Sequence, residues 1–213
     1  MKQIIIVGAR GWGREVYHAI SNTPEVKNGK LKIKGFLDSD SDALAGLRGT
    51  FPPILGAPED YIPQEDELFF IALGDSHWRK HYAEMMEEKG ARFYTYISPN
   101  AVVYDNAFIG EGSYIAGWSS VSDNVTLGKH TIVHSFTSLG HDAKVGDYST
   151  LLSYVFLGGY VEVGKCSTMN PKSMIIPHKK IGDNVSVGAA SVVIRNVKDN
   201  LHVHGNPAVK INI

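Results

Sequence analysis

Between residues 97 and 192 the apolar positions of the chain recur at every sixth residue. The second position of these hexads is glycine in eight of sixteen, and the fifth is Ala, Ser, Thr or Val except at Lys179. This period predicts a β-helix built from hexapeptide repeats. The first position is apolar in all sixteen hexads: Ile97, Val103, Ile109, Ile115, Val121, Leu127, Val133, Leu139, Val145, Leu151, Leu157, Val163, Met169, Ile175, Ile181 and Val187.

Each hexad is expected to form one short strand and one turn. The first residue points into the core, and the small fifth residue fits a crowded interior corner. The recurrent glycines are expected to relieve tight turns that need a positive φ. Stacked coils pair as parallel strands roughly 4.8 Å apart, and a coil is stable only because its neighbours bury its interior. A polar side chain in this region is therefore expected to face solvent.

Residues 1–95 follow a different pattern, in which apolar runs alternate with helical periodicity. Alternating strands and helices are typical of a parallel α/β sheet. We therefore predict a small Rossmann-like α/β domain at residues 1–95 and a β-helix domain with a C-terminal cap at residues 96–213. The predicted strands are Lys2–Val7, Leu31–Leu37, Glu67–Leu73 and Arg92–Ile97, and the predicted helices end near Ser21 and Lys89, the second being capped by Ser76.

Composition and charge exclude several classes of function and location. The net charge is −1, so no field of one sign attracts nucleic acid or an anionic membrane. Cys166 is the only cysteine, which excludes an internal disulfide and indicates a reducing compartment. The chain has no apolar run near the roughly 18 residues that span a bilayer, and the N-terminal apolar stretch is too short for a signal peptide. We expect a cytoplasmic protein.

A glycine-rich turn after the first strand is the first candidate binding element. The spacing G-x-x-G-x-G brings backbone N–H groups and a helix N-terminus to a phosphate. Because the domain is too small for a complete dinucleotide fold, we predict a site for the diphosphate of a nucleotide sugar rather than an NAD-dependent dehydrogenase. Asp38 is expected to reach the nucleoside, and Arg79 is either a phosphate ligand or a solvated helix charge. The predicted substrate-binding residues are Gly8, Gly11, Gly13, Asp38, Gly74, Asp75 and Arg79.

Histidines in the repeat region raise the question of a metal site. They are His130, His134, His141 and His178. Three converging imidazoles bind zinc in some β-helix enzymes. The spacings of four and seven residues among the first three histidines do not match such a site, so we predict no metal.

Together these motifs resemble the bacterial sugar O-acyltransferases of the sialic acid O-acetyltransferase type. That family includes the bacillosamine-pathway N-acetyltransferases of nucleotide-linked 4-amino-4,6-dideoxy sugars. The resemblance rests on IIIVGARGWGREV, FLDSD, ALGDSHWRK, the hexads, GHD and HGNPA, and it covers nearly the whole chain. It implies a left-handed β-helix with roughly 18 residues per coil. It also implies a homotrimer with acetyl-CoA between neighbouring β-helices, and nucleotide binding by the N-terminal domain.

By this resemblance His141 is the general base, Asp142 is its partner, and Gly159 lies one coil on. Bare backbone at Gly159 permits a ligand to approach closely. An amine or alcohol must lose a proton to attack a thioester, and imidazole, with an ordinary pKa near 6.5, suits this task. A neighbouring carboxylate fixes the tautomer, and a backbone N–H stabilises the carbonyl oxygen. We expect direct transfer in a ternary complex. The alternative is that His141 is a retained structural residue.

The resemblance also implies a set of acetyl-CoA contacts: Gly159, Thr150, Ala189, Gly205 and Pro207. Capping of the last coil would by itself explain the tail that contains the last two residues. Thr150 stands where the amino-sugar enzymes have a second histidine, His134 where they have asparagine, and Phe136 where glycine is usual. These departures predict that the surroundings of His141 are remodelled.

The sequence therefore predicts an acetyl-CoA-dependent acetyltransferase that N-acetylates a UDP-linked 4-amino-4,6-dideoxy sugar for a bacterial surface glycan. Two alternatives stay open. One is an O-acetyltransferase that acts on a sugar such as sialic acid. The other is a catalytically silent trimeric protein that binds a nucleotide sugar, which the three departures would explain.

Overall fold

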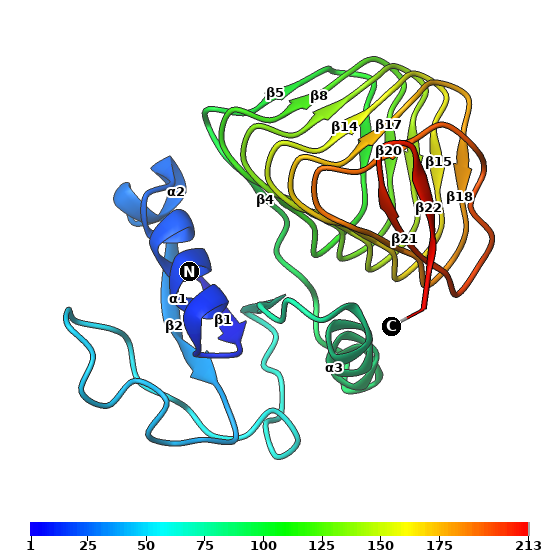
Figure 1. The fold of residues 1–213 in the computed structure, drawn as a ribbon. Coiled ribbons are helices and arrows are strands. Elements are labelled where there is room, and N and C mark those ends of the chain that lie inside the picture. Colours follow the sequence, from blue (N-terminus) through cyan, green and yellow to red (C-terminus); the bar gives the residue numbers. More distant parts are fainter. Residues whose placement is uncertain (213) are drawn as a thin grey trace. The chain divides into compact units, whose positions relative to one another are not determined.

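The computed structural model describes residues 1–212, which form two compact units (Figure 1). The first unit is Met1–Thr95, and the second begins at Tyr96. The strands of the first unit pair in parallel in the order β2-β1-β3, which confirms the predicted α/β sheet. Its elements are β1 Lys2–Val7, α1 Gly11–Ser21, α2 Pro24–Lys27, β2 Leu31–Leu37, β3 Glu67–Ile71 and α3 Ser76–Glu88.

The centre of this sheet is apolar on both faces, as a parallel sheet requires. Ile4, Ile5 and Ile6 on β1 and Phe69 and Phe70 on β3 are fully buried. Because β1 lies between its two parallel partners, the carboxyl ends of all three strands meet at one edge. That edge is where open α/β sheets bind ligands.

Two boundaries in this unit differ from the prediction. β3 ends at Ile71, two residues earlier than predicted. The strand predicted at Arg92–Ile97 is reduced to one bridge between Phe93 and Phe69. The Phe69 N–H donates to the Arg92 carbonyl, and the Phe69 carbonyl accepts from the Tyr94 N–H. The last two residues of the predicted strand, Tyr96–Ile97, form β4 of the second unit.

The second unit is the predicted β-helix. Every third strand pairs in parallel with partners 18 residues apart, so three sheets form the sides of the coils seen in Figure 1. Its two-residue strands are β4 Tyr96–Ile97, β5 Val102–Val103, β6 Phe108–Ile109, β7 Tyr114–Ile115, β8 Ser120–Val121, β9 Thr126–Leu127, β10 Ile132–Val133, β11 Ser138–Leu139, β12 Lys144–Val145, β13 Thr150–Leu151, β14 Phe156–Leu157, β15 Glu162–Val163, β16 Thr168–Met169, β17 Met174–Ile175, β18 Lys180–Ile181, β19 Ser186–Val187 and β20 Val192–Val193.

The interior of the β-helix is a continuous apolar core made by the first hexad positions from Ile115 onward, together with apolar fifth positions such as Val125 and Val161, whereas the first position of the first hexad, Ile97, is exposed. The repeat runs one strand further than predicted, because β20 pairs with β17 and Val193 is buried in that core. After it, β21 His202–Gly205 pairs in parallel with β19 and in antiparallel with β22 Ala208–Ile211. The C-terminal segment thus extends one side of the β-helix as a hairpin.

The recurrent glycines are needed for close packing, not for a positive φ as we predicted. A Cβ at Gly110 would lie 2.4 Å from the carbonyl carbon of Gly128, and a Cβ at Gly140 would lie 2.6 Å from the nitrogen of Gly159. At these two glycines, therefore, any side chain would collide with the backbone of the next coil, whereas eight other hexads accept a side chain at the same position. The positive φ falls instead at the fourth hexad position, which is occupied mostly by other residues, such as Asp142 with φ +59°.

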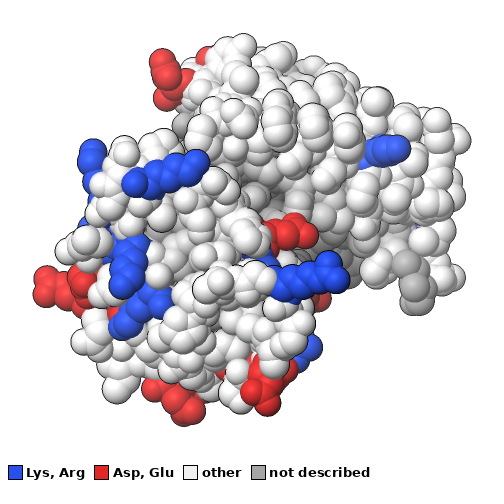
Figure 2. Space-filling model, turned by 90° about the vertical axis from the view of Figure 1, so that its left-hand side faces the viewer, with Lys and Arg blue, Asp and Glu red and all other residues white. Residues whose placement is uncertain are grey.

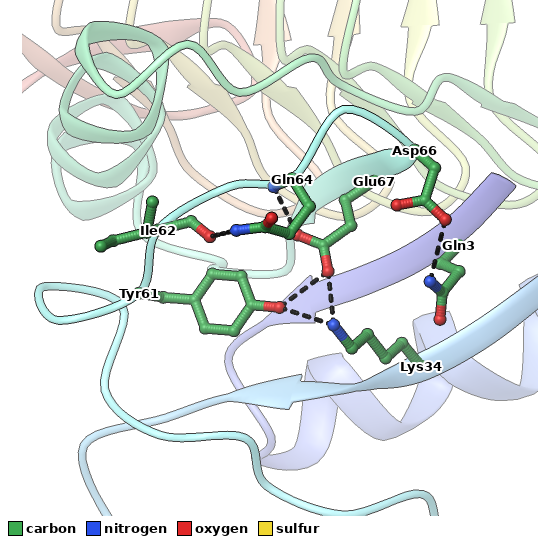
Figure 3. A network of polar contacts seen from close by, with 7 residues as sticks. All are labelled: Gln3, Lys34, Tyr61, Ile62, Gln64, Asp66 and Glu67. Carbon is green, nitrogen blue, oxygen red and sulfur yellow. Dashed lines mark hydrogen bonds and ion pairs between the residues drawn. The ribbon is translucent and has the colours of Figure 1, made fainter.

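A half-buried ion pair, in which Glu67 is buried and Lys34 partly exposed, holds the long segment between β2 and β3 (Figure 3). Lys34 is the extra residue of a β-bulge opposite β1, and its ammonium donates to Glu67 at 2.6 Å and to the Tyr61 hydroxyl at 3.0 Å. Tyr61 also donates to Glu67 at 2.8 Å. The bond to Glu67, followed by the bond to Tyr61, raises the pKa of Lys34 well above its usual range. This network pins the chain just after Pro58, which lines the cavity described below.

Candidate active site

The fourth hexad positions form columns that run along the corners of the β-helix. Residues 18 apart occupy the same corner, and their left-handed φ values repeat at every turn. The His141 corner has the column Asn124, Asp142, Tyr160 and His178; the His130 corner has Gly112, His130, Tyr148, Cys166 and Asn184; the Trp118 corner has Trp118, Phe136, Tyr154, Lys172 and Ala190.

His141 and Asp142 form the predicted dyad. The Nδ1 atom of His141 lies 2.8 Å from Oδ2 of Asp142. The Asn124 amide donates to Oδ1 of the same carboxylate at 2.7 Å. Hydrogen bonds from Asn124 and then from His141 hold the pKa of Asp142 below its usual value, so the carboxylate is an acceptor at neutral pH. The network therefore assigns the proton of neutral His141 to Nδ1 and leaves a lone pair on Nε2.

The Nε2 edge of His141 lies over bare backbone. A Cβ at Gly159 would be 2.8 Å from both Nε2 and Cε1, so the ring occupies space that any other residue at 159 would fill. Tyr160 meets the ring edge-on with centroids 5.2 Å apart, and Tyr160 is itself stacked on His178. The His141 side chain is 59% exposed, which leaves it open to a ligand. A dyad of this kind can take a proton from an incoming nucleophile.

The fold positions this dyad through the backbone of the turn. Asp142 donates its N–H to the carbonyl of Asp123 at 3.0 Å, and Tyr160 donates to the carbonyl of His141 at 3.0 Å. Asp142 has a left-handed φ, which aspartate tolerates better than most residues. A cavity of about 160 Å³ lies beside the dyad and is lined by Asn124, Asp142, Lys144, Tyr160 and Glu162.

The predicted acetyl-CoA contacts lie on two different sides of the β-helix. Gly159 touches the His141 ring, at the corner between the β11 and β12 sheets. Thr150 lies in β13, and Ala189 follows β19 of the same sheet. Gly205 and Pro207 belong to the hairpin that extends this sheet, where the Gly205 N–H donates to Ser191 at 2.9 Å. A single chain does not bring the second group to His141.

The three departures from the family pattern are also not neighbours of His141 within one chain. Phe136 is stacked between Trp118 and Tyr154 on the Trp118 corner, with centroids 5.5 and 4.9 Å apart. Thr150 lies in β13 and His134 directly follows β10, and both strands belong to the sheet that contains β19. His141 follows β11, which belongs to a different sheet. The prediction of remodelled surroundings therefore does not hold within the single chain.

The glycine turn of the first unit is built by close packing. A Cβ at Gly13 would lie 1.9 Å from the carbonyl oxygen of Gly8, and Gly8 itself has φ +99°. Gly11 has no atom within 4 Å of such a Cβ, so its position is open. The Asp38 carboxylate accepts the Ala9 N–H at 2.8 Å and thereby holds the turn against the end of β2. The other carboxylate oxygen of Asp38 accepts the Asp40 N–H at 3.0 Å, so both oxygens already have a backbone donor.

Two of the predicted charged residues at this edge have structural roles. Asp75, rather than the predicted Ser76, caps α3 because its carboxylate accepts the N–H groups of His77 and Trp78, each at 2.9 Å. These bonds hold the start of the helix beside Gly74, whose own position is open.

Arg79 is 1% exposed, so its interpretation as a solvated helix charge is wrong. Its guanidinium donates to the carbonyls of Leu73 at 2.7 Å and Gly74 at 3.0 Å. Burial is tolerated because the charged group reaches these carbonyls. Arg79 therefore shapes the turn before α3.

The structure shows a small cavity at the carboxyl edge of the sheet that the sequence did not predict. It measures about 80 Å³ and is lined by Val7, Gly8, Leu37, Asp38, Ser39, Pro58, Leu73 and Tyr82. Tyr82 donates to Glu59 at 2.7 Å, and burial, followed by this bond, raises the Tyr82 pKa. Tyr82 fits a helical periodicity and so carried no signal of a site. Pro58 and Glu59 lie in an irregular segment without a motif.

Neither the surface charge nor the arrangement of potential metal ligands indicates a further site in residues 1–212. The face shown in Figure 2 carries side chains of both signs, and much of it is uncharged. Within residues 1–212, no group of His, Cys, Asp and Glu is placed to hold a metal ion. The same residues contain no helix long and apolar enough to cross a membrane.

Known proteins share both units of this chain. Residues 3–86 match the model of the PglD N-terminal domain. UDP-N-acetylbacillosamine N-acetyltransferase of Bacillus subtilis (strain 168) is 33% identical over 121 residues, which cover 54% of this chain and 51% of that protein. The match thus spans about half the length of this relative.

Two solved structures resemble the whole chain. PerB from Caulobacter crescentus, in complex with CoA and GDP-perosamine, has a TM-score of 0.87 and 22% identity over 100% of this chain and 98% of that one. The acetyltransferase domain of PglB from Neisseria gonorrhoeae FA1090, in complex with acetyl coenzyme A, has a TM-score of 0.85 and 23% identity over 99% of each chain. These likenesses show the fold, a small parallel α/β unit followed by a left-handed β-helix, as the sequence predicted. The predicted resemblance to the bacillosamine-pathway N-acetyltransferases agrees with the match of residues 3–86 and with the Bacillus subtilis relative.

Proposed function

We propose that this protein is an acetyl-CoA-dependent acetyltransferase that N-acetylates a nucleotide-linked amino sugar. The observation that carries the proposal is the His141–Asp142 dyad, whose Nε2 atom lies over the bare backbone of Gly159. The dyad supplies a base that is exposed, has a defined tautomer and has space beside it for a substrate. These are the properties that proton removal from an attacking amine requires.

The proposed reaction is direct transfer. His141 Nε2 takes a proton from the sugar amine as its nitrogen attacks the thioester carbon. Asp142 stabilises the imidazolium that forms, and a backbone N–H near Gly159 donates to the developing oxyanion. The C–S bond then breaks, and the imidazolium returns the proton to the departing thiolate. The products are the N-acetylated sugar and CoA, and no acetyl-enzyme is formed.

The substrate class rests on the first unit and on the similar proteins. The open position of Gly11, at the start of α1, gives a diphosphate access to backbone N–H groups. The cavity bounded by Asp38 and Tyr82 lies at the same edge of the sheet; at about 80 Å³ it would receive one part of the nucleoside, with the rest of the nucleoside outside it. The Bacillus subtilis relative is named for a UDP-linked sugar and the Caulobacter structure contains a GDP-linked one. We infer a UDP-linked 4-amino-4,6-dideoxy sugar destined for a bacterial surface glycan.

The proposed assembly is a homotrimer with acetyl-CoA between neighbouring β-helices. Its support is the division of the predicted acetyl-CoA contacts between the His141 corner and the sheet that contains Thr150 and Ala189. A groove between two chains would bring the corner of one chain to the sheet of the next. We place the protein in the cytoplasm, in keeping with its single free cysteine, Cys166.

Thiol release from acetyl-CoA tests the proposal directly. The acceptor panel contains a UDP-4-amino-4,6-dideoxy sugar, GDP-perosamine and sialic acid, and each arm is repeated with His141→Ala. We expect thiol release with an amino sugar, and loss of that release in the variant. Release with sialic acid alone would replace N-acetylation by O-acetylation. Binding of a nucleotide sugar with no thiol release in any arm would show a silent binding protein.

A further inference from the structure

Asn124 and Asp142 share the His141 corner one coil apart. The Asn124 Nδ2 atom donates to Oδ1 of Asp142 at 2.7 Å, and His141 Nδ1 is 2.8 Å from Oδ2. Each carboxylate oxygen therefore has its own donor. The pair of bonds fixes the rotation of the carboxylate, which the Asp142–His141 bond alone would leave less restricted.

Asn124 is held in turn by the coil before it. Its backbone N–H donates to the side-chain oxygen of Asn106 at 3.3 Å. Asn124 has φ +55°, a conformation that asparagine adopts more readily than most residues. The backbone thus presents the amide toward Asp142. Asn124 also leads the hydrogen bonds that lower the Asp142 pKa.

We propose that Asn124 is a positioning residue, which orients Asp142 so that neutral His141 keeps its proton on Nδ1 and its lone pair on Nε2. This role rests on the proposed function, in which Nε2 is the base. Without the Asn124 amide, only His141 and the Tyr160 side chain hold the Asp142 carboxylate, so the carboxylate can rotate and His141 can adopt either tautomer. The fraction of protein with Nε2 ready to accept a proton then falls.

The chain offers a matched control in Asn184. This residue has the same hexad position and φ +54°, but it lies on the His130 corner and bonds to Asn200 at 3.1 Å. Glycine at either site removes the amide without strain, because glycine adopts positive φ freely. Asn124→Asp is the shape-preserving variant, which puts an acceptor where Asp142 needs a donor.

The test uses the full chain labelled with ¹⁵N-histidine, and reads the tautomer of neutral His141 by NMR. We expect the Nδ1–H form to predominate in the wild type and in Asn184→Gly, and a mixture of tautomers in Asn124→Gly and Asn124→Asp. An unchanged tautomer in both Asn124 variants would overturn the role of Asn124. This readout requires no substrate.

Acetyl transfer by the same variants supplies the second readout. We expect kcat to fall about tenfold in Asn124→Gly and further in Asn124→Asp, with the KM for acetyl-CoA unchanged. A fall of equal size in Asn184→Gly, or a change in KM alone, would overturn the proposal. If the wild type transfers no acetyl group while its tautomer still depends on Asn124, the proposed function fails and the orientation of the dyad by Asn124 stands.

Discussion

The His130 corner and the His141 corner use the same repeat to place two histidines in opposite environments. His130 occupies the fourth hexad position, is 2% exposed and is stacked on Tyr148 with centroids 5.4 Å apart. His141 occupies the third position, is exposed, and has a carboxylate on one nitrogen and bare backbone beneath the other. The environment of a histidine in a hexad is therefore set by its position in the turn and by the residues one coil away, and only the environment of His141 suits the proposed base.

Exchange of the two imidazoles for alanine gives the largest predicted contrast. His141→Ala should lower kcat by about 10² to 10⁴, because the base is lost, and leave the thermal unfolding midpoint near that of the wild type. His130→Ala should lower the unfolding midpoint, because a buried stacked ring is removed, and leave kcat within a few fold. A His141→Ala protein with wild-type kcat would place both histidines in the structural class.

The bare backbone under His141 gives the next largest effect. In Gly159→Ala the new Cβ would lie 2.8 Å from the ring and displace it. We expect kcat to fall by about 10 to 10². The control is Gly117→Ala, at the same hexad position on the Trp118 corner, where the nearest atom to a Cβ would be Ser98 Oγ at 3.2 Å. Equal activities of the two variants would mean that the space at Gly159 does not matter.

The distinction between packed and open positions extends to the glycine turn of the first unit. In Gly13→Ala a Cβ would lie 1.9 Å from the Gly8 oxygen, so we expect the free energy of unfolding of this unit to fall by about 1 to 3 kcal/mol. Gly11→Ala should unfold like the wild type, because its site is open, yet raise the KM for the nucleotide sugar several fold. Chemical denaturation and steady-state kinetics read the two effects separately. A Gly11→Ala protein with unchanged KM would remove the turn from the substrate site.

The smallest predicted effect concerns the acid stability of the His141 corner. The pKa of Asp142 is lowered by Asn124 and His141, so its folded value lies below its unfolded value near 3.9. The stability from these bonds is therefore present above about pH 4 and is lost as the pH falls through the folded pKa. The difference in unfolding free energy between the wild type and Asp142→Asn should shrink as the pH is lowered through 4. A difference that stays constant would contradict this account of the carboxylate.

The β-helix could be predicted from the hexad pattern because an apolar residue at every sixth position fixes where each short strand lies and which side chains point into the coil. The same pattern could not show why glycine recurs, since the contact between Gly110 and Gly128 joins residues one coil apart. In the first unit, the sequence marked Arg79 as a charge near a turn. Only the fold shows it buried against the carbonyls of Leu73 and Gly74. The lining residue Tyr82 was hidden, because a helix places aromatic residues at the same spacing for packing.

The partnership of His141 with Asp142 was predictable because the two residues are adjacent in the chain. The contribution of Asn124 was not, because it depends on an 18-residue register and on an amide turned toward the carboxylate. Similarly, the predicted acetyl-CoA contacts were grouped by the family resemblance, but the structure places them on different sides of the β-helix. In the proposed trimer they would converge only through contacts between chains, which sequence periodicity within one chain does not describe.

A crystal structure with CoA and the nucleotide-linked amino sugar tests the central claim most directly. The measured quantity is the distance from His141 Nε2 to the nitrogen of the sugar amine. We predict about 2.6 to 3.2 Å, or one bridging water, with the thiol end of CoA beside Gly159. An amine held by other groups and out of reach of His141 would contradict the assignment of His141 as the base.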